Sequence, residues 1–331
     1  MVAKSDKSVR TIKVMVGLPI AALMGEDNAT TQRAVQDWLR GEQHWFADGE
    51  PQRLDVEEVI VASQPVGAMF DYLLNERGEM TPEKKVIFKR EIGILGVGMN
   101  TVDLLVVAAG APIERFTSGK NVGVRRLLEL ANSAGLYSLA EMDDQLRAGT
   151  LDLSTAQPVW SREVLGQIEK TWETHFKRFG AIVVVGGGSI LLRDELLKRF
   201  GGKACMSAEP VIATARGLYK YAVMKAAKSS DTTETIAFDA GYGAIKLYGR
   251  HGGLELQSAV STNGSRALGK MTGLKTTKRP LHIENACGSF YVGQGAHNYG
   301  RPVESLDFDR LTGSPEMLAL FHGAMTQYLQ D

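Results

Sequence analysis

The sequence predicts an α/β protein of two lobes that share a cleft. Its 331 residues exceed the usual size of one compact domain, so two lobes are expected. Apolar, β-branched runs alternate with helix-like runs along the chain, which is the pattern of an α/β fold. Glycine accounts for 36 residues, and glycine-rich turns let the backbone come close to a ligand.

The elements of the first half are expected in a regular order. Residues 11–16 are apolar and β-branched and predict a strand, which the turn at 17–19 ends. There follow a helix at 30–45, a strand at 56–62, a helix at 65–77, a hairpin of 92–95 and 102–108, and helices at 122–133 and 162–179. In the last helix four residues recur at helical spacing and predict one apolar face: Leu165, Ile168, Trp172 and Phe176.

The second half alternates in the same way. Residues 181–185 predict a short apolar strand that runs into three glycines and then a helix. A helix at 210–227 and a linker-like polar stretch at 228–234 precede an antiparallel meander at 235–238, 244–248 and 254–260. Residues 262–277 are irregular. A last helix begins at Ser314, where a cap residue, a proline and an acid follow one another.

Composition narrows the class of protein. Hydrophobic residues are 44% and charged residues 23%, which excludes a disordered chain, a collagen and a coiled coil. Lys+Arg and Asp+Glu are both 38, so no overall basic field favours direct nucleic-acid binding. Cys205 and Cys287 lack the spacing of a metal site and are expected to be reduced thiols. No apolar run approaches the roughly 20 residues of a membrane span, and the first ten residues are polar, so we expect a cytoplasmic protein without membrane contact.

Two similar turns are candidates for phosphate binding. At residues 238–246 a strand ends at Asp239 and a tight glycine turn leads into the next strand. Successive N–H groups in such a turn form an anion nest, and the adjacent Asp can hold Mg²⁺ through water. The same pattern also fits an ordinary Asp-Gly hairpin without a ligand. Residues 95–103 have the same construction, with Thr101 and Asp103 after the glycines. The chain therefore contains a strand–turn–strand motif twice.

Two further turns could line the same cleft. Residues 183–190 join an apolar strand, three glycines and a helix start, which suits a flat ring or a phosphate but also a tight strand-to-helix joint. They match neither the dinucleotide fingerprint nor the Walker P-loop. Gln64 stands where a strand ends and a helix begins. Such a glutamine is either a surface residue or, in a nucleotide cleft, a group that orients a water molecule.

Taken together, these four turns resemble those of the actin-like ATPases, and within them the bacterial plasmid-segregation filament proteins of the ParM/StbA type. The resemblance implies an actin-like (ribonuclease H-like) two-domain α/β fold with a nucleotide cleft. Residues 239–246 look like phosphate loop one, 96–103 like phosphate loop two and 186–189 like the adenosine loop. It implies that ATP or ADP is held by Gly98, Met99, Asn100, Thr101, Gly186, Gly187, Gly188, Ser189, Gly241, Tyr242, Gly243, Ala244 and Lys246.

The resemblance also implies roles and partners. Asp239 is expected to hold Mg²⁺ through water, Gln64 to orient the attacking water and Asp103 to support it. The expected activity is ATP hydrolysis coupled to self-assembly into filaments, in plasmid or DNA segregation or cytoskeletal organisation, with a DNA-binding adaptor as a further partner. Gly96 stands where the family has an Asp, which predicts slow hydrolysis. A small-molecule kinase of the same superfamily and a non-polymerising, ATP-gated scaffold are the alternatives, and residues 264–279 are either a contact loop or a solvated insertion.

The order of these motifs differs from that of the family. Phosphate loop one opens the chain in the family but stands here at Asp239. The resemblance therefore implies a circular permutation, in which the old ends are joined through the linker. Domain I is expected at 10–90 and 235–331 and domain II at 91–215. Residues 216–234 are expected to form the closing helix of domain I and the linker.

Overall fold

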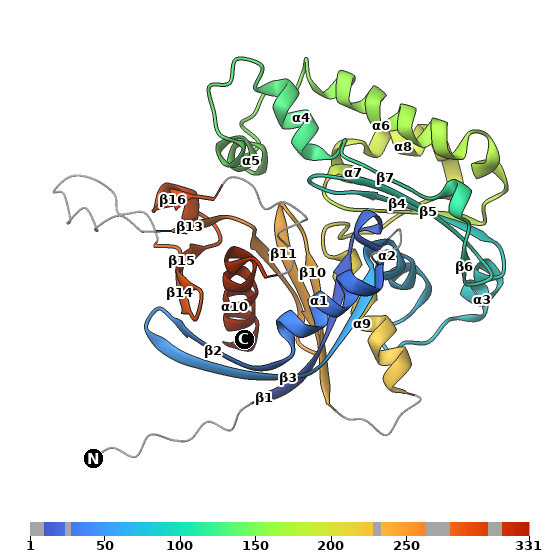
Figure 1. The fold of residues 1–331 in the computed structure, drawn as a ribbon. Helices are drawn as coiled ribbons and strands as arrows, with labels where there is room; N and C mark the ends of the chain where they lie inside the picture. Colours follow the sequence, from blue (N-terminus) through green and yellow to red (C-terminus); the bar gives the residue numbers. More distant parts are fainter. Residues whose placement is uncertain (1–9, 24–27, 228–232, 263–278, 304–312, 331) are drawn as a thin grey trace, which may run out of the picture.

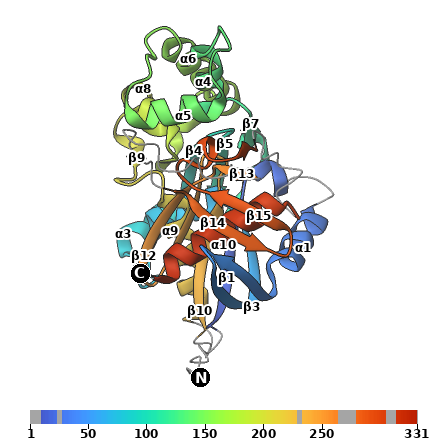
Figure 2. The ribbon, with the colours of Figure 1, turned by 90° about the vertical axis from the view of Figure 1, so that its left-hand side faces the viewer.

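The computed structural model describes residues 10–23, 28–227, 233–262, 279–303 and 313–330, which form two lobes, each built on one β-sheet (Figure 1). A second view shows the lobe with the smaller sheet above the other (Figure 2). We call the lobe with the larger sheet lobe I and the other lobe II. No helix among the described residues is long and apolar enough to cross a membrane.

Lobe I contains a ten-stranded sheet in the order β12-β11-β10-β1-β3-β2-β14-β15-β13-β16. Its strands are β1 (Arg10–Leu18), β2 (Gly41–Ala47), β3 (Glu50–Ser63), β10 (Glu234–Ala240), β11 (Ala244–Gly249), β12 (Gly252–Gln257), β13 (Val260–Thr262), β14 (Leu281–Asn285), β15 (Gly288–Val292) and β16 (Arg301–Pro302). The helices α1 (Asn28–Leu39) and α10 (Pro315–Gln330) and the short turns η1 (Ile20–Leu23) and η5 (Ala296–Asn298) accompany them. Much of the core lies between the sheet and α10, where the ring of Phe321 meets that of Phe238 edge-on at 5.2 Å.

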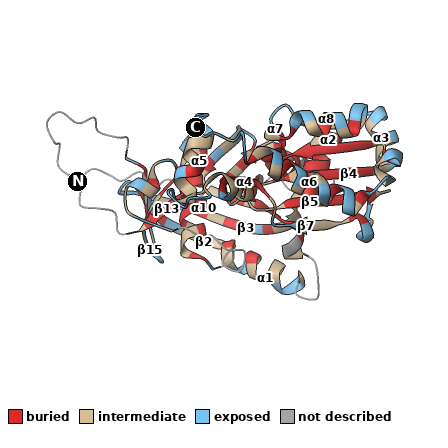
Figure 3. Cartoon of the chain, turned by 90° about the horizontal axis from the view of Figure 1, so that it is seen from above, coloured by how far each residue is buried: buried red, intermediate tan, exposed pale blue. Residues whose placement is uncertain are grey.

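Lobe II contains a smaller sheet in the order β6-β5-β4-β8-β9, with β7 paired to β5. Its strands are β4 (Glu91–Val97), β5 (Val102–Ala108), β6 (Ala111–Pro112), β7 (Ser118–Lys120), β8 (Ala181–Val185) and β9 (Ala204–Met206). Its helices are α3 (Pro82–Phe88), α4 (Val124–Ala131), α5 (Leu139–Ala148), α6 (Gln157–Trp172), α7 (Gly188–Leu191) and α8 (Arg193–Phe200), with turns η2 (Glu114–Phe116), η3 (His175–Arg178) and η4 (Gly201–Lys203). The strands β4, β5 and β8 are almost entirely buried, as Figure 3 shows for β4 and β5, because side chains of helices pack on both faces of the sheet.

The two sheets share one arrangement of strands in space. In lobe II, β4 and β5 are antiparallel. On its other side β4 pairs with the parallel strand β8, which in turn pairs with the parallel strand β9. In lobe I, β10, β11 and β12 form the antiparallel meander. On its other side β10 pairs with the parallel strand β1, which in turn pairs with the parallel strand β3. In both sheets, therefore, the first strand of the meander pairs with a parallel strand, and that strand pairs with a second parallel strand.

The chain visits these equivalent strands in a different order. In lobe II the meander comes first, α6 follows it, and β8 and β9 come last. In lobe I the parallel strands β1 and β3 come first and end at Ser63, whereas the meander begins at Glu234 and α10 at Pro315. The order in lobe I is thus a cyclic shift of the order in lobe II.

Two helices cross between the lobes. Helix α2 (Gln64–Leu73) leaves lobe I after β3, and α9 (Ala213–Ala226) leaves lobe II and returns to lobe I. They meet at glycines: a Cβ on Gly67 would lie 2.7 Å from the carbonyl oxygen of Thr214, and one on Gly217 would overlap the carbonyl oxygen of Gly67. Glycine is required at these two positions because the backbones touch.

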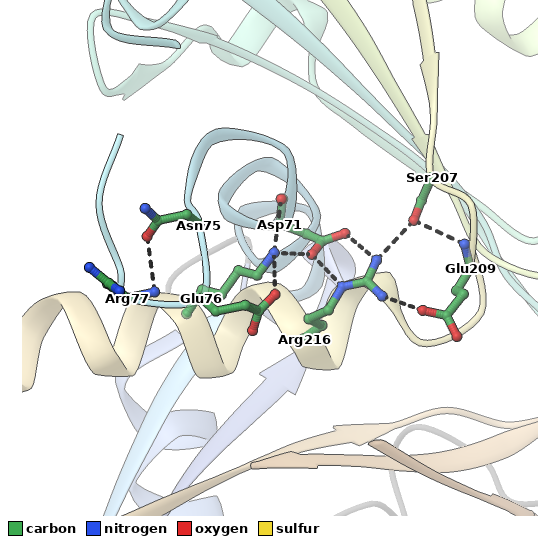
Figure 4. Close-up of polar contacts among 8 residues, drawn as sticks. Asp71, Asn75, Glu76, Arg77, Ser207, Glu209 and Arg216 are labelled. Atoms are coloured by element: carbon green, nitrogen blue, oxygen red, sulfur yellow. Dashed lines mark hydrogen bonds and ion pairs between the residues drawn. The ribbon is translucent and has the colours of Figure 1, made fainter. Parts of the chain in front are cut away.

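A group of charged side chains fastens the same crossing (Figure 4). The buried carboxylate of Asp71 on α2 accepts hydrogen bonds from Nε and Nη2 of Arg216 on α9, at 2.7 and 2.9 Å. The ammonium of Lys220, one turn further along α9, lies 3.1 Å from the same carboxylate. Arg216 also binds Glu209, at 2.7 Å, in the segment that leads from lobe II into α9. The bidentate Arg–carboxylate pair keeps the two helices in register.

The helix expected at residues 30–45 is wrong in its second half. Helix α1 ends at Leu39, and residues 41–47 form β2, which pairs antiparallel with β3. Gly41 has φ +100° and ends the helical path, and Asp48 and Gly49, both with positive φ, turn the chain back. The Asp-Gly turn was the sequence signal for this hairpin.

Other expected elements differ at their ends. The helix expected at 162–179 starts earlier and stops at Trp172, because Glu173 adopts φ +46°, so Phe176 lies in the next turn and not on the same helix. The sequence did not predict α3 and α5, although a capping box of Ser138 and Glu141 begins α5 and Gly149 caps its end. Residues 228–232 and 263–278 of the expected linker and irregular segment lie outside the described residues.

The glycine contact at the crossing predicts how alanine substitutions change the stability of the protein. Gly217→Ala is expected to lower the free energy of unfolding by about 2 kcal/mol or more, because its Cβ has no room beside α2. Gly166→Ala, in α6, is the matched control, because nothing lies within 4 Å of its Cβ, and it should stabilise the helix by about 0.5–1 kcal/mol. Urea unfolding of both variants measures the difference. Equal stability of the two would contradict the prediction.

Candidate functional site

The first glycine turn lies between β10 and β11. Asp239 occupies the carboxyl end of β10 and is 3% exposed. The N–H of Gly241 donates to the carbonyl of Asp239 at 3.0 Å, and a Cβ on Gly241 would meet the Lys246 ammonium at 2.5 Å. The turn is therefore tight, and Lys246 lies directly beside it.

The carbonyl groups of this turn are held from the β12–β13 connection. The carbonyl of Gly243 accepts the N–H of Ser258 at 3.1 Å, and the carbonyl of Gly241 accepts the Ser258 hydroxyl at 2.6 Å. In a trans peptide the N–H points opposite to the preceding carbonyl. The N–H groups of Tyr242 and Ala244 consequently point away from Ser258, so both lie on the opposite side of the turn.

The second glycine turn, between β4 and β5, is held in a similar way by the start of α4. The carbonyl of Gly98 accepts the N–H of Val124 at 3.0 Å, and that of Met99 accepts the N–H of Arg125 at 2.7 Å. The carbonyl of Asn100 accepts the N–H of Gly123, the cap residue of α4, at 3.0 Å. A Cβ on Gly123 would lie 2.5 Å from the Met99 carbonyl oxygen, so glycine is needed for this approach. The N–H groups that follow these carbonyls point the other way.

The third turn follows β8. Gly186 has φ +89° and its N–H donates to the carbonyl of Pro210 at 2.8 Å. A Cβ on Gly188 would overlap Val97 at the end of β4, so these glycines lie against the second hairpin. Ser189 is buried and its hydroxyl donates to the Gly186 carbonyl at 2.7 Å, so this residue supports the turn from within.

These three turns line one cavity of about 320 Å³ between the lobes. Of the residues that the sequence singled out, its lining contains Gln64, Gly98, Met99, Asn100, Thr101, Asp103, Gly186, Gly187, Gly188, Asp239, Gly241, Tyr242, Gly243, Ala244 and Lys246. Ser189 is absent from the lining. The side chains of Ile190, Leu191 and Val211 form an apolar wall beside the third turn, where Ile190 is 56% exposed. Such a wall suits a flat ring.

Three polar side chains meet at the floor of the cavity. The amide Nε2 of Gln64 donates to Oδ1 of Asp239 at 2.6 Å, and Nζ of Lys246 lies 3.3 Å from Oδ2 of the same carboxylate. Gln64 is the first residue of α2, where Pro65 fixes the helix start. The crossing helix thereby brings Gln64 to the end of β10, 175 residues away in sequence.

Asp103 is the second carboxylate of the cavity. Its Oδ2 accepts the hydroxyl of Thr101 at 2.9 Å, whereas Oδ1 is buried and has no hydrogen-bond partner among the described residues. Burial raises the pKa of Asp103 to about 6, and the Thr101 hydrogen bond lowers it in part. A buried acceptor without a partner indicates that a ligand or water belongs there.

The residues present fit a magnesium–phosphate group. Mg²⁺ is commonly held by one or two carboxylates together with substrate phosphates and waters, so a cage of protein ligands is not needed. Asp239 and Asp103 both line the cavity, and the described residues contain no cluster of three or more His, Cys, Asp or Glu that could hold a metal alone. The donor set therefore suits an ion that arrives with a phosphate.

Four residues of this site were not predicted. Ser258 and Gly123 hold the two hairpins from behind, and Arg147 and Glu255 line the cavity mouth. Gly123 stands just before a helix, which is a weak local signal. The other three have no local signal, because the side-chain contacts that bring them to this site span 17 to 108 residues of sequence.

The structure is similar to solved actin-like proteins. The actin-like protein Alp7A superposes with a TM-score of 0.55 at 15% identity, over 68% of this chain and 70% of that chain. The pCBH ParM non-polymerisable quadruple mutant gives 0.51 at 16%, over 65% and 68%, and apo psk41 ParM gives 0.50 at 18%, over 67% and 66%. No protein-family model and no curated protein matches the sequence. At these identities the similarity shows the fold: the chain has the actin-like α/β fold predicted above.

The buried carboxyl of Asp103 predicts that the stability of the protein depends on pH. Because the pKa of Asp103 is raised on folding, the folded state keeps its proton longer than the unfolded state, and stability falls as pH rises from about 4 to 6. Asp103→Asn is therefore expected to raise the free energy of unfolding at pH 7.5 by up to about 3 kcal/mol and to change it little at pH 4. Asp37→Asn, on the exposed side of α1, is the control. Thermal melts without nucleotide test this; an equal shift at both pH values would contradict it.

Proposed function

We propose that this chain binds Mg-ATP between its lobes, hydrolyses it slowly and assembles into filaments. The observation that supports the proposal best is the meeting of two glycine hairpins, one from each lobe, at a single cavity. A triphosphate spans two such hairpins, and the adjacent apolar wall suits its base. The site residues keep the roles expected from the sequence, with Ser189 as a support of the third turn and not a contact.

The side chains at the cavity floor suggest how hydrolysis proceeds. Lys246 and the hairpin N–H groups hold and neutralise the phosphates. Gln64 donates its amide N–H to Asp239, which leaves its amide oxygen to orient a water. At pH 7 a carboxyl with a pKa of about 6 is mostly ionised, so Asp103 can accept a proton from that water. Magnesium, when bound, stabilises charge on the phosphate oxygens.

Gly96 supports slow turnover. This residue lies at the end of β4, opposite Asp103 across the hairpin, where the ParM-type pattern has a second carboxylate. A Cβ at Gly96 would meet its nearest neighbours, the Cβ and carbonyl oxygen of Asp103 and Val185, at 3.8–4.0 Å. These are ordinary contact distances, so the site has room for a side chain. With glycine there, the cavity has one fewer group to hold the ion, while phosphate binding through backbone remains.

The proposal includes assembly into filaments. This part rests on likeness of fold to ParM and Alp7A, and one of those ParM structures is described as a non-polymerisable mutant. A head-to-tail contact that does not close produces a filament. Plasmid or DNA segregation, or cytoskeletal organisation, is the corresponding role, and a DNA-binding adaptor would supply the nucleic-acid contact that a net charge of zero does not favour.

We also propose that the chain is a circular permutation of the common actin-like order. The cyclic shift between the strand orders of the two lobes supports this, because joining α10 to β1 would give lobe I the order of lobe II. The hydroxyl of Tyr328, near the end of α10, accepts the N–H of His251 in the β11–β12 turn. That turn lies at the end of the sheet where β10 and β1 begin. The proposed domains are 10–90 with 235–331 and 91–215, with 216–234 as closing helix and linker.

Nucleotide binding and assembly can be tested together. The protein is expected to bind ATP and ADP in Mg²⁺ in calorimetry, to pellet with ATP more than with ADP, and to release phosphate slowly. Turnover that requires a small acceptor, without pelleting, would indicate a kinase. Binding without pelleting or turnover would indicate a scaffold. Absence of nucleotide binding would overturn the proposal.

The missing carboxylate gives a sharper test of the chemistry. Gly96→Asp is expected to raise the rate of phosphate release by about tenfold, because it adds a ligand for the ion beside Asp103. Gly96→Ala is the matched control, since it fills the same space without a charge and should leave the rate unchanged. Fast release by the unaltered protein, or equal rates in both variants, would contradict the role given to Gly96.

A reordered chain tests the permutation. In it, residues 233–330 come first and a short flexible linker joins Gln330 to Arg10, so that the chain ends at residue 227. The expected result is a folded protein with the circular dichroism spectrum and nucleotide affinity of the original. Loss of cooperative unfolding would show that the ends of α10 and β1 cannot be joined in this fold.

A further inference from the structure

A cluster of polar contacts joins the lobes at the mouth of the cavity. It consists of Asp143, Asp144 and Arg147 on α5 of lobe II, and Glu255 and Gln257 on β12 of lobe I, and we call it the clasp. The guanidinium of Arg147 lies 2.8 Å from Asp143 and 3.1 Å from Glu255. The amide Nε2 of Gln257 donates to Asp144 at 2.9 Å and to Asp143 at 3.2 Å. Each strand residue therefore binds the helix directly.

Local geometry explains why these five residues meet. Asp143 and Arg147 are four positions apart and lie on one face of α5. Glu255 and Gln257 are two positions apart and lie on one face of β12. Because Gln257 donates to the same Asp143 oxygen that accepts from Arg147, the two faces form one connected network.

Arg147 also reaches the first hairpin. Its Nη2 donates to the carbonyl of Gly243 at 3.1 Å, and that carbonyl also accepts the Ser258 N–H. One guanidinium thus connects helix α5, strand β12 and the turn whose N–H groups face a phosphate in the proposed site. Such a fixed fork of donors is a property of arginine that lysine lacks.

The clasp lies where it can influence opening of the lobes. Asp143, Arg147 and Glu255 line the nucleotide cavity, and a second cavity of about 340 Å³ shares Asp143 and Gly243 with it. Figure 1 shows α5 away from the crossing of α2 and α9. The backbones of α2 and α9 touch at the crossing glycines, and the clasp joins the lobes at a distance from that contact.

We infer that the clasp holds the two lobes in their closed arrangement and that Arg147 positions the first phosphate hairpin. The side chain of Arg147 is 41% exposed, so solvent weakens both of its ion pairs, to Asp143 and to Glu255. Of the two ion pairs of Arg147, the one to Glu255 joins the lobes, and an exposed pair changes an equilibrium by about two- to fivefold. With the hydrogen bonds from Gln257 to α5 and from Arg147 to Gly243, the clasp favours closure by roughly tenfold. Such a bias still allows the lobes to open for a ligand. A ligand that touches both hairpins binds the closed form, so its apparent affinity rises with the fraction of molecules that the clasp keeps closed.

The part of this inference that concerns nucleotide rests on the proposed function, whereas lobe closure does not. Two measurements therefore accompany each variant: the radius of gyration of the nucleotide-free protein by X-ray scattering, and the rate of ADP dissociation in Mg²⁺. Arg147→Gln is expected to enlarge the nucleotide-free protein and to speed ADP release by about tenfold. Arg126→Gln is the matched control, because Arg126 is 39% exposed and binds Glu163 within lobe II. It should change neither quantity.

Two more variants separate closure from hairpin positioning. Glu255→Gln removes the charged partner on lobe I but keeps the Arg147 contact to Gly243, so it should enlarge the protein and speed ADP release only about threefold. Arg147→Lys keeps the charge near Asp143 and Glu255 but not the three-way fork. Arg147→Lys is therefore expected to keep the radius of gyration of the unaltered protein, while ADP dissociates as fast as it does from Arg147→Gln.

The outcomes distinguish the two proposals. If Arg147→Gln behaves like Arg126→Gln in both measurements, the clasp is overturned. If Arg147→Lys restores both size and release, Arg147 acts through charge alone and its positioning role is overturned. If the unaltered protein binds no ADP, the proposed function fails, while the scattering comparison still decides whether the clasp closes the lobes.

Discussion

The contact between α2 and α9 at Gly67 and Gly217 is the constraint on which the rest of the structure depends. The backbones touch there, and the Asp71–Arg216 pair keeps the helices in register. Gln64 is the first residue of α2, and Thr214 near the start of α9 lines the cavity. The crossing therefore sets both the position of the lobes and the floor of the site. A side chain at either glycine would separate the elements that carry the polar groups.

The phosphate hairpins show how a backbone site is built from behind. Each turn has its carbonyls engaged by another segment: the start of α4 in lobe II, and Ser258 with Arg147 in lobe I. Because the peptide is planar, fixing the carbonyls orients the N–H groups. Glycine makes the turn possible, but the supporting segment determines where its donors point. The clasp adds a contact between the lobes to the support of the first hairpin.

The strand order has a consequence for folding. β1 pairs with β10 and β3 along almost its full length, and Ile12 faces Glu234, 222 residues away in the chain. Lobe II, in contrast, forms its sheet from residues 91–206, within one continuous stretch. Contacts that are distant in sequence form late, because closing a long loop costs entropy before any contact is gained. Lobe II is thus the part that can form its sheet first.

The sequence alone determined the strands that end in glycine turns, the apolar strand β8 and the capped helix α10, because burial period, cap residues and turn residues are local properties. It also indicated Asp239, Asp103 and Gln64, since each follows a recognisable strand or turn. Only the tertiary structure decided that Ser258, Gly123 and Arg147 support the hairpins, and that Gly67 must meet Gly217. It also changed the second half of the expected helix at 30–45 into β2, because pairing with β3 outweighed helical pattern. These outcomes depend on which distant segments touch, and no local pattern of side chains encodes that.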